Sequence, residues 1–260
     1  MRTEDILTRH GPMRVIEGDV WISRCLKETG EHSQSELNLM ELVLGIQTNG
    51  RYDGVVIDGG AFIGDHTIPL SRMCRRLYAF EPQAETREIL KYNLDQNHIT
   101  NVEVMPFALG DRVEATTYNP DHTEVMGDGS IAHSPGGTQV GVGTEPCQLE
   151  TLDHLGLRAD FIKADIEGME IPMLAGGFQT LRETRPTLFL EYDTVIQAEL
   201  LPLKECLSLM NYKSYPMTFP MWSPDNFNKT PNTFGSTVAK MMLGVPGVGE
   251  VCRGLTVTHL

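Results

Sequence analysis

The sequence lacks long apolar runs, and no stretch of about 18 uncharged apolar residues is available to span a bilayer. Its first residues, MRTEDILTRHGP, carry charges of both signs and no apolar segment followed by small residues, so they do not resemble a secretory signal. We therefore expect a cytoplasmic protein that has no membrane partner.

Cysteine is scarce and follows no disulfide or metal-binding pattern. The chain has 5 cysteines, and no two of them stand at C-x-x-C spacing. An odd number of widely spaced cysteines argues against a disulfide framework and against a zinc cluster. The five are Cys25, Cys74, Cys147, Cys206 and Cys252. We expect reduced thiols, most of them buried.

Positive charge is also in short supply. The chain has 21 Lys and Arg residues against 35 Asp and Glu residues, which gives a formal net charge of -14. No run rich in Lys and Arg gathers positive charge in one place. A surface of this sign repels a phosphate backbone, so we expect no nucleic-acid partner.

Short apolar runs alternate with segments of helical spacing along most of the chain. The runs that we expect to be strands are residues 55–57, 77–80, 102–105, 161–164 and 187–190. Helices are expected after the first run to about Met73, over 84–97, and over 170–182. Strands separated by helices predict a doubly wound α/β domain with a mostly parallel sheet, whose ligands bind beyond the carboxyl ends of the strands.

No repeat or break in composition marks a boundary between domains. We expect residues 51–260 to form the main domain and residues 1–50 to form a lead-in that packs in the same compact unit. In the lead-in, Ser33 and Glu36 have the spacing of a capping box, which predicts a helix that ends near Gly45 or near 49–50.

Two polar segments lie outside this regular pattern. Residues 111–143 are polar and rich in glycine, which predicts an irregular hairpin or a loop over a site. In the tail, Trp222, Asn226 and Phe227 either roof a pocket or seal the edge of the sheet. Residues 238–245 are expected to form a last strand or a short helix.

The first strand ends in a turn rich in glycine, VVIDGGAFIGDHT. Gly60 and Gly64 stand where a ligand could approach the backbone and meet free amides at a helix N-terminus. Phe62 occupies the place of the middle glycine of a dinucleotide turn, so a pyrophosphate fits poorly. Glu81 ends the second strand and is placed to accept hydrogen bonds from both hydroxyls of a ribose. These features favour a nucleoside-like ligand.

Several separated blocks resemble the FkbM-type family of class I methyltransferases. They extend from about Trp21 to Met242, and the combination of AFEP with KADIEGME is specific. The blocks are WISRCLKETGEHSQSE, VVIDGGAFIGDHT, YAFEPQAETREILKYNLDQN, PFALGD, FIKADIEGMEIPMLAG, RPTLFLEYD and SPDNFN.

The resemblance implies a Rossmann-like fold and transfer of a methyl group from S-adenosylmethionine, usually to a hydroxyl oxygen of a small-molecule or carbohydrate-like acceptor. Carried over by position, the resemblance implies cofactor contacts in four places. Asp58, Gly60, Ala61, Phe62 and Gly64 would lie near the methionine end, and Glu81 and Pro82 at the ribose. Ala108 and Leu109, with Phe107, would lie at the adenine, and Asp165 would face the reacting methyl. Phe62 departs from the family, where Asn is frequent, so a polar contact near the methionine moiety is missing or is supplied elsewhere.

Polar residues at the end of the fourth strand supply candidates for catalysis. Methyl transfer needs a nucleophilic oxygen held in line, and a carboxylate beside the acceptor can orient its hydroxyl and take its proton. We expect Asp165 in that role, with Glu167 and Lys163 beside it; alternatively, Lys163 only forms an ion pair with an acid. A further alternative is that Asp165, Glu167 and Glu191 hold a divalent metal such as Mg²⁺, although no D-x-D or D-x-x-x-D motif compels it. Histidines near these segments are His66, His122 and His133, and none is assigned a role.

Two other functions are compatible with the glycine turn and the strand-end acid. An NAD-dependent oxidoreductase would use the same acid, but the Tyr-x-x-x-Lys spacing of a common proton relay is absent. A non-catalytic relative would keep the fold and bind a nucleotide cofactor without turnover.

Overall fold

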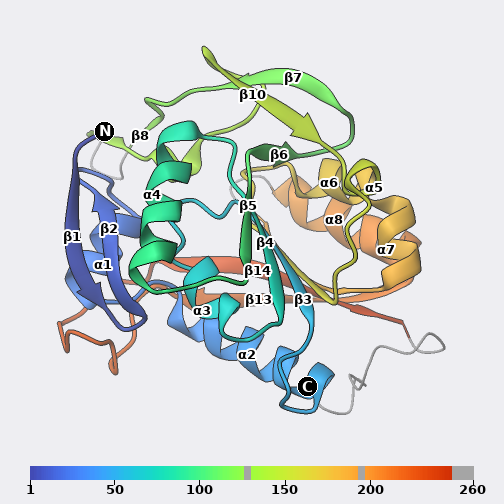
Figure 1. Cartoon of the computed structure of the whole chain (residues 1–260), viewed down its shortest axis with the longest axis horizontal. Coiled ribbons are helices and arrows are strands. Elements are labelled where there is room, and N and C mark those ends of the chain that lie inside the picture. The colour runs from blue at the N-terminus through green and yellow to red at the C-terminus, as the bar shows by residue number, and fades with distance from the viewer. Residues whose placement is uncertain (126–129, 193–196, 248–260) are drawn as a thin grey trace.

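The computed structural model describes residues 1–125, 130–192 and 197–247. Its centre is a seven-stranded sheet in the order β13-β14-β12-β11-β3-β4-β5 (Figure 1). The strands are β3 (Val55–Gly59), β4 (Arg76–Phe80), β5 (Val102–Met105), β11 (Phe161–Ala164), β12 (Thr187–Glu191), β13 (Tyr212–Pro220) and β14 (Val238–Pro246).

The sheet is mostly parallel, as the alternating pattern predicted. Strands β5, β4, β3, β11 and β12 pair in parallel, whereas β14 is antiparallel to both of its neighbours. All five expected strands are present, and the segment left open as strand or helix is the strand β14. Strand β13 was not predicted, because Pro216 and Pro220 interrupt its pattern; proline is tolerated there since β13 lies at the edge of the sheet.

Helices cover both faces of the sheet, which gives three layers. One face carries α1 (Ile22–Thr29), α2 (Gln34–Thr48), α3 (Thr67–Ser71) and α4 (Ala84–Gln96), and the other carries α5 (Leu152–Leu155), α6 (Glu170–Gly176), α7 (Phe178–Thr184) and α8 (Gln197–Leu209). Neighbouring residues of a strand point to opposite faces. Accordingly, Val56 and Phe161 enter the first core, whereas Ile57 and Ile162 enter the second.

Three helix predictions need correction. Ser33 has a left-handed backbone (φ 47°) and makes no side-chain cap, so the capping box is not formed even though α2 begins directly after it. The helix expected to Met73 ends at Ser71. The helix expected over 170–182 is two helices that meet at Gly177, where a Cβ would lie 2.9 Å from Leu152 Cδ1.

The lead-in contains an unpredicted antiparallel hairpin, β1 (Thr3–Thr8) with β2 (Gly11–Ile16). It lies beside α4 (Figure 1). The Asn93 side chain joins the two, because its amide donates to Arg14 O at 3.0 Å and its oxygen accepts from Arg14 N at 2.6 Å.

The glycine-rich stretch, residues 111–143, contains an antiparallel pair of strands, in line with the hairpin alternative, and contributes a strand to a second small sheet. Strands β6 (Phe107–Leu109), β10 (Glu145–Glu150) and β7 (Glu114–Tyr118) make one, β8 (Thr123–Val125) and β9 (Ile131–His133) make another, and the short helix η1 (Pro135–Gly137) follows. The Gln83 side chain donates to Pro135 O at 2.9 Å, which fixes η1 near the carboxyl end of β4.

Two simpler expectations can be compared with the described residues. None of the helices in the described ranges has the length and apolar character needed to cross a membrane. The four cysteines within these ranges are free thiols, and Cys25 and Cys74 are buried. Cys252 lies outside the described residues.

Candidate active site

The glycine turn after β3 packs tightly against the turn after β11. Gly60 has φ 73°, and a Cβ at this position would lie 1.8 Å from the carbonyl oxygen of Asp165. Its amide and that of Ala61 both donate to Phe80 O, at 3.1 and 3.0 Å. These two amides are therefore engaged by the neighbouring strand. Gly64 has a packing role, because a Cβ there would lie 2.7 Å from Leu90 Cδ1 of α4.

The Glu81 carboxylate is held at the end of β4 by two backbone amides. Oε2 accepts from Phe62 N at 2.9 Å and Oε1 accepts from Gln83 N at 2.8 Å. Burial raises the pKa of Glu81 to about 7, and the backbone hydrogen bonds only partly oppose this effect. Each oxygen keeps a second lone pair, so Glu81 can still accept hydrogen bonds from a ligand.

A first, small cavity of about 50 Å³ opens beside Glu81. Its walls are mainly apolar, with Glu81, Gln83, Asp165 and Glu167 among the polar groups. The cavity contains the residues expected at an adenine and a ribose. They are Glu81, Pro82, Phe107, Ala108 and Leu109, and the walls are completed by others such as Phe80, Ile166 and Met169.

A second, larger cavity of about 350 Å³ adjoins the first. The two share six lining residues, namely Gly60, Glu81, Gln83, Gly136, Asp165 and Glu167. Phe62 and Glu191 line the second cavity alone. A ligand in the first cavity could therefore extend past Gly60 and Asp165 into the second.

Sequence reasoning missed much of the second cavity. Six of its polar or aromatic residues come from the lead-in and from β8, and they are Asp19, Trp21, His32, Ser33, Glu36 and Glu124. The tail contributes Met221 and Val238, whereas Trp222, Asn226 and Phe227 do not line it. Phe227 packs against Gly30 after α1, and its amide donates to Glu31 Oε2 at 3.0 Å. In the sequence, this region was indicated by the block WISRCLKETGEHSQSE, and that resemblance assigned no role to any of its residues.

Lys163 and Asp58 lie beneath the glycine turn, and neither lines the two cavities. Lys163 is 1% exposed, and its Nζ lies 3.3 Å from Asp58 Oδ1 and 3.8 Å from Asp165 Oδ2. It also donates to the carbonyl oxygens of Gly59 and Gly60. Burial alone would lower the pKa of Lys163, but the neighbouring carboxylates raise it above its usual range. The charged ammonium thus ties the turn to Asp165.

Asp165, Glu167 and Glu191 come together at the ends of β11 and β12. One oxygen of each lies within 4.8 Å of the others, a spacing that would also suit oxygen ligands of a divalent cation. Burial and the charge of Asp165 raise the pKa of Glu191 well above its usual value. Desolvation opposes ionisation of Asp165, but Lys163 and the hydrogen bond with Glu191 lower its pKa overall. Protonated Glu191 therefore donates to ionised Asp165.

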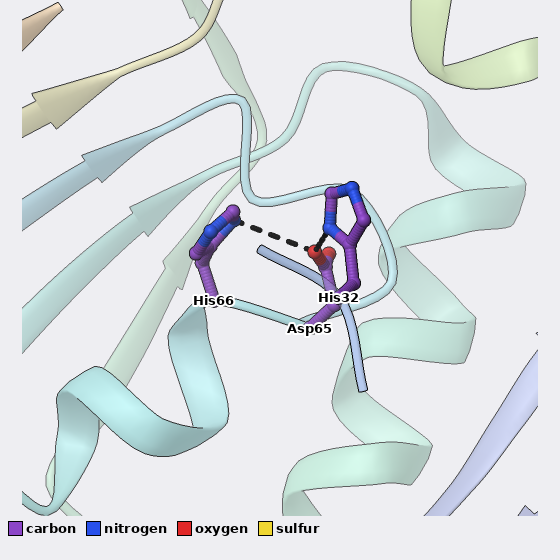
Figure 2. A group of neighbouring side chains, drawn as sticks. All are labelled: His32, Asp65 and His66. Atoms are coloured by element: carbon purple, nitrogen blue, oxygen red, sulfur yellow. Dashed lines mark hydrogen bonds and ion pairs between the residues drawn. The ribbon is translucent and has the colours of Figure 1, made fainter. Parts of the chain in front are cut away.

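His32, Asp65 and His66 form a histidine–aspartate cluster (Figure 2). His32 Nδ1 is 2.7 Å from Asp65 Oδ2, and His66 Nδ1 is 3.4 Å from the same oxygen. Burial lowers the pKa of His66 to about 3, so its ring is neutral. His32 lines the second cavity, whereas His66, His122 and His133 do not.

The order and direction of the strands, with a single antiparallel strand near one edge and cavities at the carboxyl ends, define a class I methyltransferase fold. Residues 58–215 match the model of the Methyltransferase FkbM domain. This match covers more than half of the chain, so the chain belongs to the FkbM methyltransferase family, and the resemblance of the sequence blocks is confirmed. The oxidoreductase alternative is thereby set aside.

Solved structures share this fold at low sequence identity. A methyltransferase FkbM from Methylobacillus flagellatus KT is 18% identical with a TM-score of 0.50, and the match covers 74% of this chain and 43% of that one. This chain therefore spans less than half of that protein's length. TYW2 from M. jannaschii, solved in complex with AdoMet, is 14% identical with a TM-score of 0.50, over 93% of this chain and 84% of that one. A search of curated proteins gave no match.

Proposed function

We propose that this methyltransferase uses S-adenosylmethionine to methylate a hydroxyl oxygen of an uncharged small-molecule acceptor, of a carbohydrate-like kind. The observation that carries the proposal is the pair of adjoining cavities. One has apolar walls and the Glu81 carboxylate, the other is large and acidic, and Gly60 and Asp165 stand where they join.

The first cavity suits the adenosine part of the cofactor. Phe107, Leu109 and Met169 offer apolar contacts to an adenine, and Glu81 can accept hydrogen bonds from ribose hydroxyls. Beyond Gly60, the carboxylate of Asp165 faces the place of the sulfonium and attracts its positive charge. When bound, S-adenosylmethionine supplies an electrophilic methyl group at this junction.

The charges of the second cavity favour an acceptor without phosphate groups. Its lining carries seven carboxyl groups and no Lys or Arg side chain among the described residues. These acids are Asp19, Glu36, Glu81, Glu124, Asp165, Glu167 and Glu191. Carboxylates accept hydrogen bonds from hydroxyl groups but repel phosphates, which disfavours a nucleic-acid substrate at this site. The fold alone would not distinguish these acceptors, because methyltransferase folds host many substrates.

Asp165 is the residue placed to orient the acceptor. Its lowered pKa keeps the carboxylate ionised, so it can accept a hydrogen bond from the acceptor hydroxyl and hold that oxygen toward the methyl group. Glu191 holds Asp165 through the proton that they share, and Lys163 holds it from below.

Calorimetric titration tests the cofactor assignment. S-adenosylmethionine and S-adenosylhomocysteine should bind to the wild-type protein, and NAD should not. Glu81→Ala should weaken binding about 10- to 100-fold, because hydrogen bonds to a charged group contribute about 1.5–3 kcal/mol. Glu88→Ala is the matched control, since Glu88 is exposed on α4 and pairs with the exposed Lys91. Binding of NAD instead, or equal binding by both variants, would contradict the proposal.

Formation of S-adenosylhomocysteine with a panel of probes tests the acceptor. Methyl α-glucoside and catechol represent neutral hydroxyl acceptors, and an RNA oligonucleotide represents a polyanion. Turnover with a hydroxyl probe, lost in Asp165→Asn while S-adenosylhomocysteine still binds, would support the assigned role. Turnover with the oligonucleotide alone would refute the acceptor class and leave the cofactor assignment intact.

A further inference from the structure

One nitrogen of the His32 ring forms a hydrogen bond with Asp65, and the other points away from Asp65 (Figure 2). The bonded nitrogen is Nδ1, which lies 2.7 Å from Asp65 Oδ2. His32 lines the second cavity, but Asp65 and His66 do not. Asp65 is therefore behind the ring, and His32 is the member of the cluster that a molecule in the cavity can reach.

We propose that His32 accepts the proton of the methyl acceptor through Nε2 and that Asp65 is its positioning residue. This inference rests on the proposed methyl transfer to a hydroxyl and assigns the proton step to a residue outside the matched family domain, which begins at residue 58.

The hydrogen bond to Asp65 determines which nitrogen carries the proton. An ionised carboxylate can only accept, so Nδ1 of His32 must be the donor and the lone pair of a neutral ring lies on Nε2. Among the described residues, no hydrogen bond engages Nε2 of His32. This nitrogen thus keeps its lone pair for a group in the cavity.

Asp65 is held ionised by the hydrogen bond from His32 and by the nearby charge of Lys163. Burial would raise the pKa of Asp65, but these two groups lower it below its usual range. The side chain of Asp65 is 4% exposed, so water competes little for its oxygens. His66 Nδ1, at 3.4 Å, approaches the same oxygen from the other side.

Charged groups from three elements face His32. Asp65 lies on the turn before α3, Glu36 lies on α2, and Asp165 follows β11. Burial lowers the pKa of His32, but these carboxyl groups outweigh burial and raise it above its usual value. The pKa of Asp165 is lowered instead, so His32 is the better proton acceptor and Asp165 the better orienting group.

The step balances without any other reactant. The acceptor oxygen forms a bond to the methyl carbon, and the bond between that carbon and the cofactor sulfur breaks with its electrons on sulfur. The hydroxyl proton passes to Nε2, which makes His32 an imidazolium beside Asp65. Solvent entering the open cavity removes this proton after the product leaves.

Nitrogen-15 NMR of the histidine rings in the ligand-free protein tests the arrangement without an acceptor or a cofactor. His32→Asn assigns the resonances. The neutral ring of His32 should carry its proton on Nδ1, and Asp65→Asn should lower the pKa of His32 by about one unit or more, because an adjacent opposite charge is lost. A proton on Nε2 in the neutral ring, or a pKa that does not move in Asp65→Asn, would overturn the proposal.

Turnover of the hydroxyl probe tests the chemical role. His32→Asn keeps a donor toward Asp65 but has no basic nitrogen, so kcat should fall about 10²- to 10⁴-fold while S-adenosylhomocysteine affinity is unchanged. Added imidazole should restore part of the rate. His98→Asn is the control, since His98 is exposed and has a left-handed backbone (φ 55°) that Asn tolerates.

The two proposals fail in different ways. A wild-type protein that binds no adenosyl ligand would refute the proposed function, whereas the NMR result would still report on His32 and Asp65. Full turnover in His32→Asn, or a rate that falls only in step with cofactor binding, would overturn the role of His32 and leave the methyltransferase assignment standing.

Discussion

Replacing Gly60 by alanine should destabilise the protein much more than the same change at Gly50. Both glycines have nearly the same backbone conformation, with φ 73° at Gly60 and 72° at Gly50. They differ in their surroundings, because a Cβ at Gly60 meets the Asp165 carbonyl oxygen at 1.8 Å, whereas a Cβ at Gly50 meets nothing within 4 Å. The pair therefore separates steric conflict from backbone strain.

The magnitudes follow from these two terms. A left-handed conformation costs an alanine about 1–2 kcal/mol, and this cost applies to both variants. At Gly60 the obstructing atom belongs to the backbone, so two strand-end turns must move apart, and overpacking of this kind costs about 1–3 kcal/mol more. The entropy lost by the unfolded chain on Gly→Ala is common to both and cancels.

Urea denaturation followed by circular dichroism measures the difference. We expect the free energy of unfolding of Gly60→Ala to lie about 1–3 kcal/mol below that of Gly50→Ala, with similar m-values. Gly60→Ala should also weaken binding of S-adenosylhomocysteine, because the turns that must separate line both cavities. Equal stabilities of the two variants would refute the steric argument.

Two further predictions concern buried charges. Lys163→Met should lower the free energy of unfolding by about 3–5 kcal/mol, since Asp58 would be left buried without its partner. A second change, Asp58→Asn, should recover much of this loss. A double variant as unstable as Lys163→Met would contradict this role of Lys163. Burial raises the pKa of Glu36 from 4.5 to about 7 in the folded protein. Between these two pH values the folded state therefore holds a proton that the unfolded state has lost. The free energy of unfolding consequently falls as the pH rises from about 4.5 to 7. Between pH 5 and pH 8, Glu36→Gln should therefore become more stable relative to wild type, by up to about 3 kcal/mol. If the free energies of unfolding of the two proteins change in parallel with pH, Glu36 does not titrate in this way.

The central fold could be predicted because its strands are buried on both faces. Continuous apolar runs such as 55–57 and 161–164 are typical of buried parallel strands, and the helix after β4 carries apolar residues at regular spacing. The edge strand β13 and the hairpin β1–β2 were missed because half-exposed strands tolerate proline and polar residues, which weakens their pattern.

The two sides of the candidate site differ in how far they could be predicted. Glu81, Ala108 and Leu109 follow strands of the central sheet, so their positions near a common cavity follow from topology. Trp21 and His32 reach the second cavity only because the lead-in folds back over the sheet, and no local pattern encodes that contact. Lys163 was placed beside Asp165 as expected, but its burial beneath the turn depends on the packing of Gly60.

The wall of the second cavity has a consequence for how this family can change its substrates. The matched domain, residues 58–215, supplies Glu81 and the adenine-side residues, whereas Trp21 and His32 precede it and Val238 follows it. All residues of the first cavity lie within the matched domain, and the second cavity is built partly from the flanking stretches. Changes in the flanking stretches can therefore reshape one part of the second cavity's wall while the first cavity is inherited unchanged.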